Sequence, residues 1–156
     1  MRKTIFLSIL IILTVSALHA QTYDIIDFTA DDMNGTKIKL SNFNDKVVVL
    51  DFWATWCRPC REEIPNLIDI KNTFKNKKFE IISIALERGS SAKAVNFVKE
   101  NNMNWVHIVD IAKTTELAQK YQIRYVPTVY VIKNGKIVAT GLRGEALKRK
   151  IKELIG

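Results

Sequence analysis

Cysteine, proline and glycine are scarce in this sequence, with two, three and six residues among 156. A bridge between Cys57 and Cys60 would close a loop of about four residues and contribute only about 2 kcal/mol in the chain-entropy model. Such a bridge is poorly suited to holding a fold together, but it is well suited to opening and closing. No Pro/Gly/Ser-rich linker, internal repeat or low-complexity tract divides the chain. The length and the apolar fraction of 47% therefore predict one ordered domain.

The longest apolar run, residues 5–18, is shorter than the roughly 20 residues that span a bilayer. Arg2 and Lys3 precede this run, and Ala17-Leu18-His19-Ala20 ends it with small residues near a plausible cleavage site. This layout is typical of a secretory signal peptide. We expect residues 1–20 to be a signal peptide cleaved near Ala20, residues 21–156 to be the mature domain, and the protein to be periplasmic or otherwise extracytoplasmic. An uncleaved membrane anchor is the alternative, and no cysteine lies near the cut for lipid modification.

The basic charge of the chain does not point to nucleic acid. Removing Arg2 and Lys3 with the leader leaves 22 of the 24 basic residues against 16 acidic ones, a net charge of +6. The densest basic run, residues 148–150, lies on a predicted helix whose apolar stripe includes Leu147 and Ile151. A solvated helix face explains this run, and an acidic partner protein or a membrane surface remains the alternative.

Hydrophobic periodicity predicts an α/β domain. Strands are expected at residues 23–28, 37–40, 47–53, 79–86, 105–109, 128–132 and 136–140, and helices from residue 58 and at 90–100, 114–121 and 145–155. Strands that alternate with helices imply parallel pairing, and Asn134-Gly135 predicts a terminal hairpin. The expected architecture is a mixed central sheet flanked by helices, with Pro65 kinking the helix that begins at Arg58.

The motif Trp56-Cys57-Arg58-Pro59-Cys60 follows a buried strand and opens a helix. Residues three apart lie on one helical face, so the two sulfurs can meet. Cys57 would sit at the helix N-terminus, where unpaired N–H groups favour a thiolate, and Arg58 would add positive charge nearby. Cys60, one turn further in, is expected to be shielded and to react second. A CxxC motif can also bind metal.

Residues 51–60 resemble the active-site segment of the thioredoxin superfamily, and residues 121–128 resemble its second signature. The resemblance implies a thioredoxin fold in which Pro127 is a cis-proline facing the cysteines. It also implies that Trp56, Arg58, Pro59, Val126 and Pro127 form the substrate-binding surface. Peptide groups beside the cis-proline would pair with an extended substrate strand.

The TlpA/ResA branch of the superfamily resembles the chain over about residues 23–156. The shared features are the exported N-terminus, a hairpin at 23–40 and an extra helix and strand at 90–109 before the cis-proline. The resemblance implies a thiol-disulfide oxidoreductase that reduces protein disulfides outside the cytoplasm. Its substrates would include apocytochrome c, within cytochrome c biogenesis, and its electrons would come from a membrane thiol donor. A monomer with no cofactor is expected.

Two carboxylates are candidates for proton transfer at Cys60. Asp51 lies in an apolar strand, where burial raises the pKa of a carboxyl. The ResA-like branch often has Asn at this position, so Asp51 departs from it. Glu87, at the end of the next strand, matches a glutamate near the cysteines in some members. The alternatives are a satisfied buried polar group for Asp51 and a surface carboxylate for Glu87.

A thiolate metal-binding module, for instance for copper delivery, is the second function class, because soft Cu(I) accepts thiolates. The sequence offers no convincing third ligand, and no resident metal is expected. His107 lies in the extra strand and is interpreted as structural. A peroxidase is less well supported, because both cysteines lie in one CxxC motif.

Overall fold

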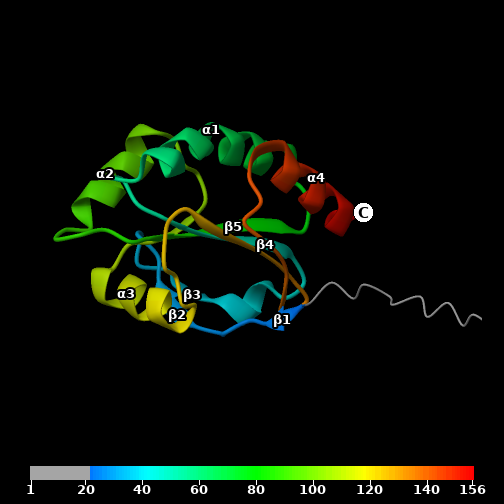
Figure 1. The fold of residues 1–156 in the computed structure, drawn as a ribbon, viewed down its shortest axis with the longest axis horizontal. Coiled ribbons are helices and arrows are strands. Elements are labelled where there is room, and N and C mark those ends of the chain that lie inside the picture. The colour runs from blue at the N-terminus through cyan, green and yellow to red at the C-terminus, as the bar shows by residue number, and fades with distance from the viewer. Residues whose placement is uncertain (1–21) are drawn as a thin grey trace, which may run out of the picture.

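The computed structural model describes residues 22–156, which form a central sheet with helices on both faces (Figure 1). The elements in chain order are β1 (Tyr23–Asp24), β2 (Thr29–Asp31), β3 (Lys37–Lys39), a 3₁₀ turn (Leu40–Phe43), β4 (Val47–Trp53), α1 (Arg58–Thr73), β5 (Phe79–Ala85), α2 (Ala92–Glu100), β6 (Val106–Ile108), α3 (Ile111–Lys120), β7 (Thr128–Lys133), β8 (Lys136–Thr140) and α4 (Gly144–Ile155). The predicted signal peptide lies outside the described residues. Among the described residues, no helix is long and apolar enough to cross a membrane.

The six-stranded sheet has the order β1-β8-β7-β4-β5-β6. Strands β4, β5 and β6 are parallel, and β7, β8 and β1 add antiparallel pairs at the other edge. The predicted mixed sheet is therefore confirmed. Asn134 and Gly135 have φ angles of 51° and 70° in the β7–β8 turn, the left-handed conformation that a two-residue hairpin turn requires.

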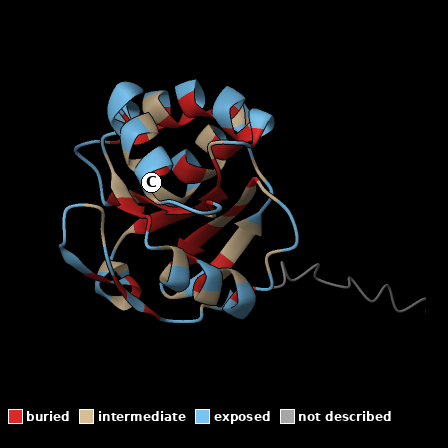
Figure 2. Cartoon of the chain, turned by 90° about the vertical axis from the view of Figure 1, so that its left-hand side faces the viewer, coloured by how far each residue is buried: buried red, intermediate tan, exposed pale blue. Residues whose placement is uncertain are grey.

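The two faces of the sheet are covered differently (Figure 1). Even-numbered residues of β4 pack toward α3 and the β2–β3 hairpin, in a cluster that includes Leu50, Ile38 and Leu117. Odd-numbered residues pack toward α1 and α4, in a cluster that includes Val49 and Leu147. Burial on both faces explains why β4 reads as a continuous apolar run. Figure 2 shows the buried residues concentrated in the strands, with the outer helix faces exposed.

Two predicted boundaries were wrong. The first strand of the hairpin is β2 rather than residues 23–28, because Tyr23–Asp24 instead pairs with β8 at the sheet edge. Helix α3 begins at Ile111 rather than 114, because the Asp110 side chain caps it by accepting from the Lys113 N–H at 2.7 Å. Helix α1 runs continuously from Arg58 to Thr73 with Pro65 inside it.

Candidate active site

Strand register brings three loops to one end of the sheet. Phe52, near the end of β4, pairs with Thr128 at the start of β7. Trp53, the last residue of β4, pairs with Ala85, the last residue of β5. The loop after β4, the loop after β5 and the loop before β7 therefore begin or end side by side. These loops contain the CxxC motif, Glu87 and Pro127.

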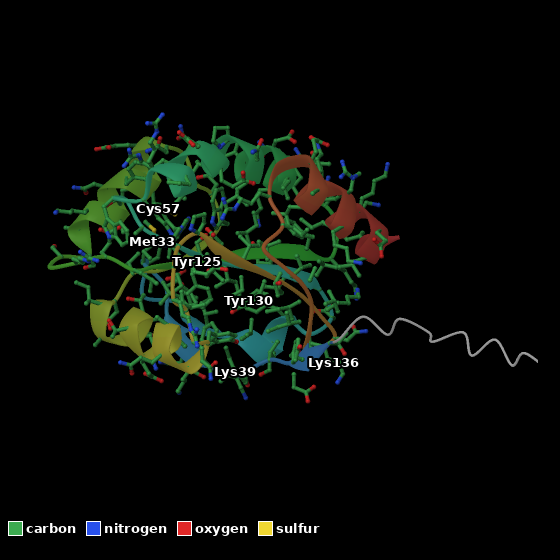
Figure 3. The ribbon with its side chains drawn as sticks, in the orientation of Figure 1. Met33, Lys39, Cys57, Tyr125, Tyr130 and Lys136 are labelled. Atoms are coloured by element: carbon green, nitrogen blue, oxygen red, sulfur yellow. A yellow bond between two sulfur atoms is a disulfide. The ribbon has the colours of Figure 1, made fainter. Side chains whose placement is uncertain are left out.

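Cys57 and Cys60 form a disulfide with an S–S distance of 2.09 Å and a Cα–Cα distance of 5.3 Å. Cys57 is the N-cap of α1, and its sulfur accepts a hydrogen bond from the backbone N–H of Cys60 at 3.2 Å. The two residues are 4% and 3% exposed. Burial does not distinguish them in the oxidised state, whereas their places on the helix do, because Cys57 is the N-cap and Cys60 is the third residue of the helix. Cys57 is labelled in Figure 3.

The expected substrate-binding residues of the CxxC segment are exposed. Trp56 donates its indole N–H to the Leu86 carbonyl at 3.3 Å, which fixes the ring beside the disulfide. Pro59 occupies the first turn of α1, where a missing N–H costs little. Arg58 pairs with Glu62 at 2.8 Å, and its side chain is 82% exposed. The positive charge expected beside Cys57 is therefore shared with a carboxylate.

The Val126–Pro127 peptide bond is cis. Pro127 is buried, and Val126 packs against the apolar cluster that contains both cysteines. Arg143, in the loop after β8, donates to the Pro127 carbonyl at 3.2 Å. The cis-proline loop is thus held against the disulfide on one side and tied to the β8–α4 loop on the other.

Asp51 is buried in the middle of β4. Burial raises the pKa of its carboxyl to about 7, although Ser83 donates a hydrogen bond to it at 3.1 Å and thereby lowers the pKa. The charge of Glu63 raises the pKa further, and that of Arg143 lowers it. A carboxyl with a pKa near 7 can exchange a proton with a thiol at neutral pH.

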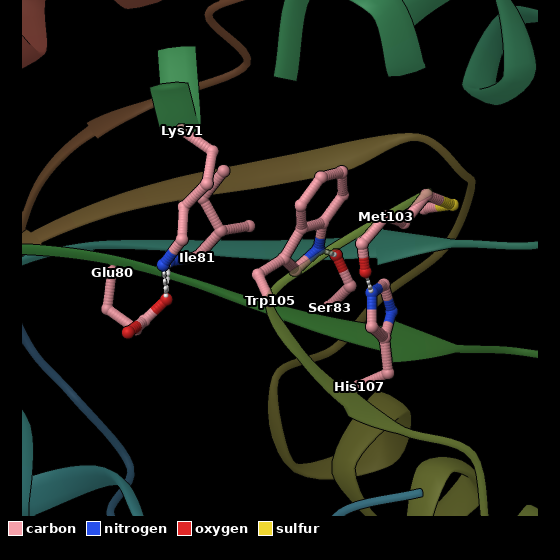
Figure 4. A network of polar contacts seen from close by, with 7 residues as sticks. All are labelled: Lys71, Glu80, Ile81, Ser83, Met103, Trp105 and His107. Carbon is pink, nitrogen blue, oxygen red and sulfur yellow. Dashed lines mark hydrogen bonds and ion pairs between the residues drawn. The ribbon is translucent and has the colours of Figure 1, made fainter. Parts of the chain in front are cut away.

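A row of polar side chains runs across the sheet at the level of Asp51. Asp51 pairs with Ser83 on β5, and Ser83 pairs with His107 on β6. Trp105 donates its indole N–H to the Ser83 hydroxyl at 2.9 Å (Figure 4). The hydroxyl thus accepts one hydrogen bond and donates another to Asp51. His107 bonds the Met103 carbonyl through Nε2 at 3.0 Å, and burial lowers its pKa to about 4, so it is neutral at pH 7.

Sequence reasoning missed Ser83, Glu63, Arg143 and the polar contact of Trp105. Only the polar type of Ser83, inside an apolar strand, was visible as a signal. Glu63 reads as an ordinary helix-surface residue, yet it is buried and accepts from the Gly144 N–H at 2.6 Å.

Glu87 is buried rather than on the surface, so the surface alternative is wrong. One of its carboxylate oxygens accepts from the Thr55 N–H at 2.6 Å, and the other accepts from the Thr55 hydroxyl at 3.0 Å. Both oxygens thus bind the residue two positions before Cys57. The geometry makes Glu87 an anchor for the loop that carries the CxxC motif.

Across residues 22–156, no three His, Cys, Asp or Glu side chains gather where they could hold a metal ion. No contact among these residues favours the copper-delivery alternative.

The fold and the disulfide at the strand-to-helix junction define a thiol-disulfide oxidoreductase of the thioredoxin superfamily. Residues 22–140 match the AhpC/TSA family. The thiol-disulfide oxidoreductase ResA of Bacillus subtilis is 33% identical over 136 residues, which cover 85% of this chain and 74% of the relative. The ResA of Bacillus thuringiensis is also 33% identical, over 83% of this chain and 73% of that protein. The chain belongs to the AhpC/TSA family and is a ResA-like thiol-disulfide oxidoreductase.

Solved structures agree with this assignment. The thioredoxin domain of a thiol-disulfide oxidoreductase from Bacteroides vulgatus superposes with a TM-score of 0.79 at 27% identity, covering 86% of this chain and 96% of that one. A thiol-disulfide oxidoreductase from Bacteroides fragilis superposes with a TM-score of 0.75 at 30% identity, covering 85% and 99%. The predicted thioredoxin fold and enzyme class are confirmed.

Proposed function

We propose that this protein reduces protein disulfides outside the cytoplasm, with Cys57 as the attacking thiol and Cys60 as the resolving thiol. The observation that carries the proposal is the position of Cys57 as N-cap of a 16-residue helix. Unpaired N–H groups and the helix dipole favour a thiolate there, and the thiolate is the reactive species.

Electrons and protons balance over two exchanges. The Cys57 thiolate attacks one sulfur of the substrate disulfide, forms a mixed disulfide and releases the other substrate sulfur as a thiolate, which takes a proton from water. Cys60 then loses its proton to Asp51 and attacks the Cys57 sulfur, which releases the second substrate sulfur as a thiolate. This thiolate takes a proton from water, and Asp51 returns its proton to the solvent. The protein ends with the Cys57–Cys60 disulfide, and a dithiol donor must return two electrons.

The remaining details of the proposal come from the ResA-like resemblance and the leader sequence. Cleavage near Ala20 would release a mature protein outside the cytoplasm. A membrane thiol donor would supply the electrons, and apocytochrome c would be among the substrates. The mature protein would act as a monomer, with substrate bound across Trp56, Arg58, Pro59, Val126 and Pro127.

Trapping with a Cys60→Ser variant tests the assignment of the two cysteines. This variant should accumulate mixed disulfides with its substrates in intact cells, because the bond at Cys57 cannot be resolved. Non-reducing electrophoresis followed by mass spectrometry would identify the trapped proteins. Cys57→Ser is the control and should trap nothing. Full multi-turnover reductase activity of Cys60→Ser would contradict the proposed roles.

A further inference from the structure

Arginine and lysine are distributed unequally over the described residues. Four segments surround the disulfide: residues 54–61, 86–91, 122–128 and 140–144. They contain five of the six arginines of residues 22–156, namely Arg58, Arg61, Arg88, Arg124 and Arg143, and none of the lysines. Their single acidic residue, Glu87, is buried against Thr55. We call these five arginines the arginine rim.

Contacts or chain position place four of the five arginines beside the disulfide, and Arg124 lies in the loop that carries the cis-proline. Arg61 donates to the Thr55 carbonyl at 2.6 Å. The Arg88 guanidinium lies 5.0 Å from the centre of the Trp56 ring, within cation–π distance. Arg58 follows Cys57 directly, and Arg143 binds the Pro127 carbonyl. All five arginines are nevertheless exposed, so they can meet a partner.

The rim has the composition of a protein-binding surface. The same four segments also contain two of the few exposed large apolar side chains of the described residues, Trp56, which is 51% exposed, and Tyr125, which is 72% exposed. Trp, Tyr and Arg are enriched in protein interfaces, whereas Lys is depleted. The planar guanidinium also binds a carboxylate through two parallel hydrogen bonds, which a lysine ammonium cannot do.

We propose that the arginine rim selects protein substrates whose disulfide is flanked by Asp or Glu residues. The proposal rests on the reductase function above and adds a substrate class to it. Trp56 and Tyr125 contact the substrate chain around its disulfide, and the arginines pair with carboxylates on either side. Within residues 22–156, the one ion pair of the rim joins Arg58 to Glu62, so the other four guanidinium groups have no carboxylate within ion-pair distance.

Two disulfide-bridged peptides that differ only at four positions flanking the cystine, Glu in one and Gln in the other, test the proposal. At physiological ionic strength, the reduced protein should reduce the Glu peptide in a single turnover with a second-order rate constant about five-fold or more above that for the Gln peptide, because steering by opposite charges raises association rates. The ratio should fall toward one at high salt, because the Debye length shortens to about 3 Å at 1 M.

The double variant Arg88→Gln/Arg124→Gln should lose most of this preference. Lys75→Gln/Lys152→Gln is the matched control, which removes two charges near the far end of α1. A helix of 16 residues is about 24 Å long, or about three Debye lengths at physiological salt, so this control should keep the preference.

Hydroxyethyl disulfide, which carries no charge, distinguishes a failure of the preference for acidic substrates from a failure of the reductase function. If the protein reduces this compound but reduces the two peptides at equal rates, the proposed substrate class is wrong and the reductase function stands. A preference that survives in the arginine double variant would also overturn the role of the rim. Failure to reduce any of the three disulfides would remove the proposed function and the inference together.

Discussion

Asp51 carries a carboxyl in the middle of a strand that is buried on both faces. Among the described residues, the hydrogen bond to this carboxyl comes from the Ser83 hydroxyl, which in turn accepts from Trp105. One neutral donor compensates a buried carboxylate only in part, so the neutral form is favoured and the pKa rises to about 7. Burial of this carboxylate therefore lowers the stability of the fold, while its raised pKa lets it accept a proton near neutral pH.

Replacing Asp51 by Asn should slow resolution of the mixed disulfide while leaving the attack by Cys57 largely intact. A contribution from general base catalysis is typically about 100-fold or more, so a loss of this order is expected in the resolution rate. Single-turnover kinetics on a model disulfide between about pH 5 and 9 would measure both steps. The wild-type resolution rate should rise with a midpoint near pH 7, and the variant should lack this midpoint. An unchanged rate and profile would leave Asp51 with a structural role alone.

The same residue should make folding stability depend on pH. The pKa of Asp51 is about 7 in the folded protein, against 3.8 for an unperturbed aspartate, so between these values the folded state binds the extra proton. Its contribution to the free energy of unfolding is fully present below about pH 4 and is lost as pH rises toward 7 and above. The gap between the two pKa values corresponds to a change of at most about 4 kcal/mol in the free energy of unfolding.

Urea unfolding of the oxidised protein at pH 4 and pH 8 checks this dependence. Asp51→Asn should gain stability relative to the wild type on going from pH 4 to pH 8. Asp69→Asn, on the exposed face of α1, is the control and should show no such gain. An equal pH response of wild type and Asp51→Asn would refute the raised pKa.

At the scale of elements, the β8–α4 loop connects two parts of the site. The Gly144 N–H donates to Glu63 of α1, and Arg143 donates to the carbonyl of Pro127. The same two side chains act on Asp51 with opposite signs, because Glu63 raises its pKa and Arg143 lowers it. The loop therefore sets both the position of the cis-proline and the electrostatic environment of the buried carboxyl.

Replacing Glu63 or Arg143 by neutral glutamine should move the pH midpoint of mixed-disulfide resolution, in opposite directions for the two variants. Glu63→Gln keeps an acceptor for the Gly144 N–H but removes a negative charge, so the midpoint should move to lower pH. Arg143→Gln removes a positive charge, so the midpoint should move to higher pH. Arg149→Gln, on the exposed face of α4, should leave it unchanged. Shifts of the same sign in both variants would contradict the electrostatic explanation.

The contact between Glu87 and Thr55 joins the loop after β5 to the loop after β4. Glu87→Ala would leave the Thr55 N–H without its partner, and we expect a loss of about 1–3 kcal/mol in the free energy of unfolding. Glu87→Gln keeps one acceptor oxygen and should lose less. Denaturant unfolding measures both variants, with the exposed Glu100→Ala as control. Unchanged stability together with slower resolution would instead support a role for Glu87 as a base.

At the scale of the whole molecule, the balance between dithiol and disulfide determines the direction of electron flow. The Arg58-Pro59 pair resembles reducing members of the superfamily, so we expect a potential nearer to about −270 mV than to about −120 mV. Equilibration with a dithiothreitol or glutathione redox series measures it. A value above about −150 mV would indicate an oxidase or isomerase.

Removing the carboxylate that pairs with Arg58 tests how the Arg58 charge affects the reduction potential. Glu62→Gln frees the guanidinium to stabilise the Cys57 thiolate, which favours the reduced form. The potential should then rise, by about 30 mV for each unit by which the thiol pKa falls. Lys71→Gln, at the other end of α1, should leave the potential unchanged. A lower potential in Glu62→Gln would contradict the assigned effect of Arg58.

The sequence by itself determined most of the elements, the class of fold and the redox pair. The spacing of apolar residues along the chain indicates which residues face a core. Strands β4, β5 and β7 and helix α4 were therefore predicted within a residue or two of their observed bounds. Asn134-Gly135 determined the β7–β8 turn through the backbone conformation that it tolerates. The spacing of Cys57 and Cys60 determined that their sulfurs could meet, because residues three apart share a helical face.

Only the tertiary structure decided which polar groups surround the disulfide. Tyr23–Asp24 pairs with β8, Glu87 binds Thr55, and Glu63 and Arg143 act on Asp51, although these partners lie far apart in the chain. Hydrophobic period specifies the face to which a side chain points, but not the strand or loop that lies opposite. The pKa of a buried carboxyl depends on those opposite groups and on the water that they exclude, so it is decided only when the chain has folded.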